Sequence, residues 1–261
     1  MKSILGIFLS IFLLATGAIA QQGTGGFKSG DLYLHTTVWS GISSIDGAIV
    51  HINPHTGSVT LLHDLLSSAP GTQPMTYDPW RDRLLFFGGF QGNNLELYSS
   101  DAAGNVQSLG MQTTQGGARG LLTPRGDGMV YLLNPLNTSV LSYIDAADQL
   151  HVLQDATGAA PWSFGLPMVQ IQNLIYVPKT NSLILTRYSL SDPCPGIPAN
   201  TTAIRRLDLS ADGTRVINET CFWFDSNPAD FDGETRGLSL GPNGDPILII
   251  GNGGSGSGLQ S

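Results

Sequence analysis

Residues 52–62 read INPHTGSVTLL, and three later segments repeat their design. Each contains the end of an apolar run, a polar turn rich in Asp, Asn, Gly and Ser, and a new run of alternating apolar residues. Turns of this composition join the two strands of a β-hairpin. The later segments are SSDAAGNVQSL at 99–109, IDAADQLHVL at 144–153 and LDLSADGTRVI at 207–217. Their spacing of roughly 45–65 residues is close to the repeat length of β-propeller blades.

A second hairpin motif, with proline in or beside its turn, alternates with the first. It occurs at 76–88, 122–133, 176–186 and 240–251. Alternating the two motifs gives four strands per repeat, which we term A to D, and no segment shows the apolar stripe of a helix. The sequence therefore predicts an all-β fold, a β-propeller of four-stranded antiparallel blades. A β-sandwich is the alternative, but it does not require a regular four-strand period.

About five blades are visible in the sequence. The first begins at residues 31–36 as a B strand with no clear A strand, three blades are complete, and a fifth has its A strand at 236–240 and its B strand at 246–251. We expect residues 21–261 to form a single propeller domain that is truncated at its C-terminus, with the last blade incomplete. The alternative is a five-bladed ring whose missing edge comes from residues 21–30, but this segment is Gly-rich and a poor strand former.

Residues 1–20 have the three parts of a signal peptide: Lys2, an apolar core at 4–14 and the small residues Ala18 and Ala20 before the cleavage site. The apolar stretch is short for a membrane span. We expect a secreted or extracellular protein, or a periplasmic one in a Gram-negative host, with no membrane insertion once the signal is removed.

The formal net charge is −8, with 12 Lys and Arg residues in the whole chain, and no basic stripe is present. This composition argues against nucleic acid and anionic membranes as partners. An extracellular glycan, a small molecule or a protein remains as the class of partner.

The only two cysteines, Cys194 and Cys221, are expected to pair in an oxidising compartment. Such a bridge stabilises by roughly 3 kcal/mol in the chain-entropy model, and two free thiols are the alternative. Three sequons, at Asn137, Asn200 and Asn218, would be glycosylated only in a eukaryotic host.

The acidic loop at 225–234 is a candidate calcium site, because Asp230, Asp232 and Glu234 offer the hard oxygen ligands that Ca²⁺ prefers. Its glycine is misplaced for an EF-hand, which favours the alternative of a solvated acidic loop. No other cofactor is predicted.

Four residues are candidate ligand contacts. Arg119 and Arg236 share the triplet Arg-Gly-Leu at the start of an A strand and suit recognition of a carboxylate or sulfate. Trp39 and Trp162 lie in predicted loops beside polar residues, as aromatic residues do in sugar-binding sites. The alternatives are ion pairs with neighbouring acids for the arginines and packing at the blade ends for the tryptophans.

No catalytic constellation is evident in the sequence: none of its histidines has metal-ligand spacing together with an acid partner. The Gly-x-Ser-x-Gly string at 237–241 falls on a predicted strand with no helix after it, unlike a nucleophile elbow. A histidine pair, His35 and His51, falls on adjacent predicted strands and leaves a lyase or hydrolase site open.

The pairing of a proline turn with an Asp/Gly turn before Val-x-x-Leu resembles exported propellers with YVTN, NHL or streptogramin-lyase-like repeats. The resemblance covers nearly all of residues 21–261 at the level of the blade pattern, and implies no catalytic residue. Such propellers include binding scaffolds and enzymes. We expect a secreted binding module for a glycan or another extracellular ligand; the alternatives are a lyase or hydrolase and a structural domain of a larger exported protein.

Overall fold

The computed structural model describes residues 26–28, 30–36, 48–64, 75–91, 94–112, 121–133, 140–163, 171–189, 201–224 and 234–251. Its elements are β1 (Leu32–Thr36), β2 (Ala48–Ile52), β3 (Val59–Asp64), β4 (Met75–Asp78), β5 (Arg83–Gln91), β6 (Asn94–Ser100), β7 (Val106–Gln112), β8 (Leu122–Pro124), β9 (Val130–Leu133), β10 (Leu141–Ile144), β11 (Leu150–Val152), β12 (Ile171–Val177), the 3₁₀ turn η1 (Pro178–Thr180), β13 (Ser182–Ser189), β14 (Thr201–Leu209), β15 (Val216–Phe224), β16 (Glu234–Leu240) and β17 (Pro246–Gly251). None of the described elements is a helix long and apolar enough to span a membrane.

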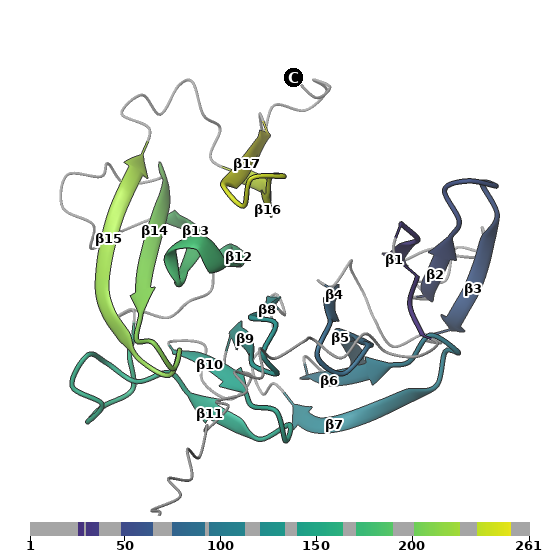
Figure 1. Cartoon of the computed structure of the whole chain (residues 1–261), viewed down its shortest axis with the longest axis horizontal. Coiled ribbons are helices and arrows are strands. Elements are labelled where there is room, and N and C mark those ends of the chain that lie inside the picture. Colours follow the sequence, from purple (N-terminus) through teal and green to yellow (C-terminus); the bar gives the residue numbers. More distant parts are fainter. Residues whose placement is uncertain are drawn as a thin grey trace, which may run out of the picture.

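The strands form separate antiparallel sheets in the order that the sequence predicts. Blade 1 contains β1–β3, blade 2 β4–β7, blade 3 β8–β11, blade 4 β12–β15, and blade 5 the pair β16–β17. The sheets follow one another in an open arc, with the A strands β4, β8, β12 and β16 near its centre and the D strands β3, β7, β11 and β15 at its rim (Figure 1). The all-β propeller architecture and both predicted hairpin motifs are therefore confirmed.

The core lies between the blades, in layers of side chains from facing sheets. Blades 3 and 4 share the largest cluster, in which Tyr131, Leu141, Leu183 and Leu207 are fully buried. Smaller apolar clusters join blades 2 and 3, blades 1 and 2, and blades 4 and 5. Because each sheet has apolar residues on both faces, a blade buries its surface only between two neighbours.

Hydrogen bonds in the C–D turns explain why those turns form. The side-chain oxygens of Asn53, Asp101 and Asp145 each accept the backbone N–H two residues further on, at 2.9 Å. Ser210 takes the same place in blade 4, where its Oγ accepts the Arg215 N–H at 3.1 Å. These side chains replace water as partners of the turn backbone.

Polar contacts also join consecutive blades. The buried Thr123 Oγ1 of β8 accepts the backbone N–H of Tyr176 in β12 at 2.9 Å, and the Tyr131 hydroxyl donates to the Gly213 carbonyl at 3.0 Å. Arg125, in the A–B turn of blade 3, donates to the carbonyls of Ala211 at 2.7 Å and Asp212 at 2.5 Å. These bonds set the stagger of blade 4 on blade 3.

Replacing Thr123 with valine tests this registration. Thr123→Val keeps the shape but leaves the buried Tyr176 N–H without its acceptor, so we expect a loss of about 1–3 kcal/mol in the free energy of unfolding. Thr60→Val, at an exposed position of β3, is the control and should change it by less than about 0.5 kcal/mol. Urea denaturation followed by circular dichroism measures both, and equal values for the two variants would contradict the assignment.

The turn carboxylates predict acid sensitivity. The Ser210 hydroxyl and the Thr214 N–H lower the pKa of Asp212 to about 2, and the Asn105 side chain lowers the pKa of Asp101. A depressed folded pKa contributes stability that is present above the unfolded value near 4 and lost as pH falls through the folded value.

We therefore expect the thermal midpoint to drop between about pH 4 and pH 2. Asp212→Asn should flatten part of that drop, because the amide does not titrate. A midpoint in the unsubstituted protein that stays constant over this range would show that these carboxylates do not control acid stability.

Candidate functional site

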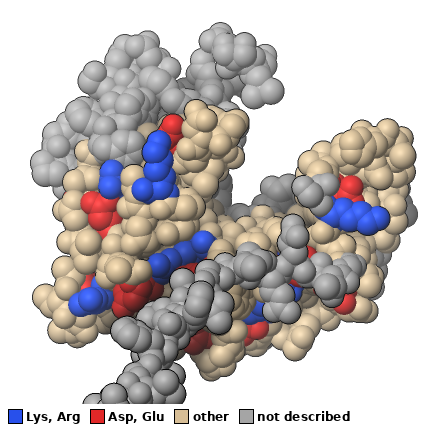
Figure 2. Space-filling model, viewed as in Figure 1, with Lys and Arg blue, Asp and Glu red and all other residues tan. Residues whose placement is uncertain are grey.

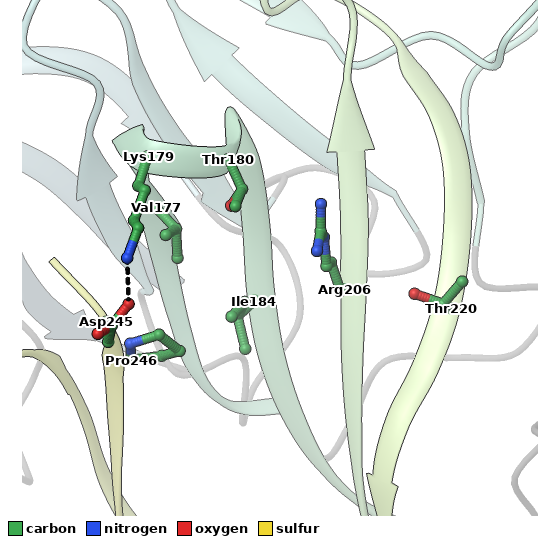
Figure 3. Close-up of a pocket in the computed structure, with 8 residues that line it drawn as sticks. All are labelled: Val177, Lys179, Thr180, Ile184, Arg206, Thr220, Asp245 and Pro246. Atoms are coloured by element: carbon green, nitrogen blue, oxygen red, sulfur yellow. Dashed lines mark hydrogen bonds and ion pairs between the residues drawn. The ribbon is translucent and has the colours of Figure 1, made fainter.

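A pocket of about 370 Å³ lies between blades 4 and 5, on the side of the arc where the A–B turns lie (Figure 3). This volume is in the range of small-molecule sites. Its lining residues are Val177, Lys179, Thr180, Ile184, Arg206, Thr220, Asp245 and Pro246.

The floor of the pocket is apolar. Val177 of β12 and Ile184 of β13 are buried and belong to the cluster in which Leu238 and Leu248 of blade 5 pack against blade 4. The floor is thus the end of the core between blades 4 and 5 that faces the pocket. Its position depends on the packing of β16 and β17 against blade 4.

The mouth carries an ion pair. Lys179 stands in η1, and its Nζ lies 2.9 Å from Oδ1 of Asp245, in the A–B turn of blade 5 (Figure 3). The chain leaves η1 through Asn181, which adopts the left-handed conformation with φ of 46° that asparagine tolerates better than most residues. Both partners of the pair are mostly exposed, so the pair adds little stability and leaves its charges available to a ligand.

Arg206 forms the wall on the β14 side. Its Nε donates to Asp208 Oδ1 at 2.6 Å, and the other oxygen of Asp208 accepts the Asn218 side-chain N–H at 3.1 Å. Asp208 therefore fixes one edge of the guanidinium. The two terminal nitrogens of Arg206 have no hydrogen-bond partner within the described part of the chain, so they are available to an acceptor in the pocket.

Arg206 occupies a position that is apolar in the other blades. It lies four residues before the first residue of the C–D turn, as do Ile49, Leu97 and Leu141 in blades 1, 2 and 3. Those three side chains are 0% exposed and covered by the next blade, whereas the Arg206 side chain is 38% exposed. The register places Arg206 between Ile184 on β13 and Thr220 on β15. This cross-strand row of blade 4 is therefore apolar at the pocket floor and polar on the two outer strands.

Most of the residues that the sequence singled out lie outside the described residues. They are the expected ligand contacts Trp39 and Arg119, the expected calcium ligands Asp230 and Asp232, Cys194 of the expected disulfide, and the sequons at Asn137 and Asn200. Glu234 and Arg236 lie in β16, of which only the backbone is described there; Arg236 is the extra residue at a register shift between Thr235 and Gly237. The pairing of the two arginines and the calcium site stay predictions.

Two predicted residues are described in full. Trp162 is 7% exposed and packs in the core between blades 3 and 4, which is the alternative that the sequence left open for each tryptophan. Asn218 is exposed on β15, next to the pocket residue Thr220.

The backbone register opposes His35 to Ile49 and His51 to Tyr33, so the two histidines are not directly paired. No group of three His, Cys, Asp or Glu residues that could hold a metal occurs among the described residues.

Cys221 of β15 is not a free cysteine, but its expected partner Cys194 lies outside the described residues, so the bridge between them stays a prediction. We expect no reactive thiol when the denatured, unreduced protein is titrated with a thiol reagent, and two after reduction. Two reactive thiols before reduction would exclude the bridge.

Four of the residues that line the pocket are not predicted from the sequence: Lys179, Arg206, Thr220 and Asp245. For Arg206 the signal was available: aligning the four C–D motifs places one arginine in a column of Ile and Leu. For Lys179 and Asp245 the sequence contains no such signal. They lie in two hydrophilic turns 66 residues apart, which meet only when blade 5 stacks on blade 4.

Comparison with solved structures supports the fold. A chain of the nidogen/laminin complex superposes with a TM-score of 0.54 at 11% identity, covering 84% of this chain and 69% of that one. TolB from Acinetobacter baumannii superposes with a TM-score of 0.55 at 14% identity, covering 87% of this chain and 48% of that one. These neighbours are of the β-propeller type.

No family model and no curated protein matches the sequence. At identities this low the likeness shows the architecture alone, and this chain spans about half the length of the TolB chain. The fold alone does not define a function, so the chemistry of the pocket is the feature that bears on it.

Proposed function

We propose that this protein is an exported propeller that serves as a binding module, and that the pocket between blades 4 and 5 takes a small acidic ligand, such as an acidic sugar unit of an extracellular glycan. The observation that carries this proposal is Arg206, a charged side chain at a blade position that buries Ile49, Leu97 and Leu141 elsewhere. An arginine at this position buries less apolar surface than the Ile or Leu of the other blades, which costs stability. Binding of a ligand by Arg206 would explain why an arginine stands there.

The chemistry of the pocket suits such a ligand. Arg206 presents two terminal nitrogens beside an Nε that Asp208 already holds, and an oriented guanidinium binds a carboxylate through two parallel hydrogen bonds. Thr220 and Thr180 supply hydroxyl groups, while Val177 and Ile184 offer an apolar surface to the C–H face of a sugar ring.

Local charge restricts the ligand to one or two acidic groups. Arg206 and Lys179 are each paired with a carboxylate, Asp208 and Asp245, so the pocket is close to neutral without its ligand. A polyanion would gain little here, because the rest of the chain carries net negative charge.

A binding panel tests the proposal. Residues 21–261 are titrated with glucuronate-, galacturonate- and sulfate-bearing oligosaccharides and with their neutral counterparts. We expect the acidic members to bind and Arg206→Leu to weaken that binding roughly ten- to a hundredfold, as the loss of a charged hydrogen bond implies.

Two controls separate binding from folding. Arg206→Leu places the side chain of the other blades at this position, so the thermal midpoint should hold or rise. Lys28→Leu removes an exposed cation of blade 1, away from the pocket, and should leave binding unchanged. Equal binding of acidic and neutral sugars, or an affinity that Arg206→Leu leaves unaltered, would reject the pocket as the site.

A further inference from the structure

Blade 1 has an apolar face that no described blade covers. In two cross-strand rows, Leu32 lies beside Ile52 and Val59, and Leu34 beside Val50 and Leu61. We call these six residues the outward face of blade 1, since they point away from blade 2. Leu32 is 54% exposed, Leu34 49%, Val59 51% and Leu61 39%, whereas Val50, between Leu34 and Leu61, is only 4% exposed. A contiguous exposed apolar surface of this kind marks an interaction site in a soluble protein.

The equivalent faces of the other blades are inter-blade interfaces. By register, Leu34 corresponds to Phe86 in blade 2, Leu132 in blade 3 and Leu183 in blade 4. All three are 0% exposed, because the preceding blade packs on them. The outward face of blade 1 is therefore equivalent to surfaces that form interfaces in blades 2, 3 and 4. By the same geometry, the partner that would cover it is the face of a preceding blade.

The inner edge of β1 points to the same occupant. β1 pairs with β2 on one side, as the B strands β5, β9 and β13 pair with their C strands. Each of those B strands also pairs with an A strand near the centre of the arc, whereas β1 has no A-strand partner in the described part of the chain (Figure 1). An open strand edge beside an exposed apolar face is a site for strand addition.

We propose that the outward face of blade 1 is an inter-blade interface, and that it receives a further blade of the same polypeptide, encoded downstream of Ser261, together with an A strand on the inner edge of β1. A blade linked to the chain acts at a high effective concentration, which favours it over a second copy. The arc also brings blade 5 and blade 1 to the two sides of its open part (Figure 1).

The surface charge agrees with an apolar occupant. The six residues of the outward face carry no charge. On the visible side of the molecule most Lys and Arg lie on the part formed by blades 3 to 5, and a further basic group lies on the side of blade 1 (Figure 2). This inference does not rest on the proposed function. Strands added to β17 would stand opposite Arg206 and form the remaining wall of the pocket, so the acidic panel is run on the longer product as well.

Sequencing the transcript beyond the codon for Ser261 is the first test. We expect an open frame with further Pro-turn and Asp-turn hairpins. The longer product is then compared with its Leu34→Lys variant, in which a lysine replaces a side chain that the added blade buries. A midpoint lower by roughly 10 °C is expected, and Ile217→Lys, at a position 53% exposed on β15, should leave it unchanged.

Hydrogen exchange gives a readout that does not depend on a variant. In the longer product the amides of β1 should be protected as strongly as those of β5. A stop codon directly after Ser261, unprotected β1 amides, or a midpoint indifferent to Leu34→Lys would overturn the proposal. So would a dimer of the 261-residue product that Leu34→Lys dissolves, since a second copy would then be the occupant.

Discussion

Every blade of this protein depends on its neighbours, because each sheet is apolar on both faces and thin. A single four-stranded sheet buries one layer of side chains at most, so stability comes from stacking sheets rather than from any sheet alone. The cluster that joins blades 3 and 4 shows the result, with Tyr131, Leu141 and Leu183 fully buried between two sheets. The turns and polar contacts then set the stagger with which the sheets meet.

Arginines in the A–B turns act on that stagger. Arg125 reaches the Ala211 and Asp212 carbonyls of the next blade, and Arg81 reaches the carbonyls of Gly128, at 3.1 Å, and Asp145. A guanidinium that donates to backbone carbonyls satisfies groups that every turn possesses, whatever its side chains. Sequence variation in the C–D turns is therefore tolerated while the contact between blades is kept.

The hairpins could be read from the sequence because each one is local. A turn such as Asp101 to Asn105 contains its own hydrogen bonds, and the alternation of apolar residues on both sides reports the strands directly. The candidate site could not be read in the same way, because Lys179 and Asp245 meet only after blade 5 stacks on blade 4. Trp162 shows the converse: an aromatic residue in a predicted loop suggested a ligand contact, and the structure buries it in a core.

Arg206 shows how a repeat architecture can gain a site with little structural change. The backbone of β14 keeps the register of the equivalent C strands, so the substitution of an apolar residue changes only what the strand presents to the next blade. Such a position is destabilising where the neighbouring blade covers it and leaves the charge buried without a partner. In blade 4 the Arg206 side chain stays partly exposed and is held by Asp208, so the penalty is avoided. Strands added after β17 would have to place polar groups opposite Arg206. The side chains at those positions would determine whether the pocket still accommodates a ligand or is filled by the added strands.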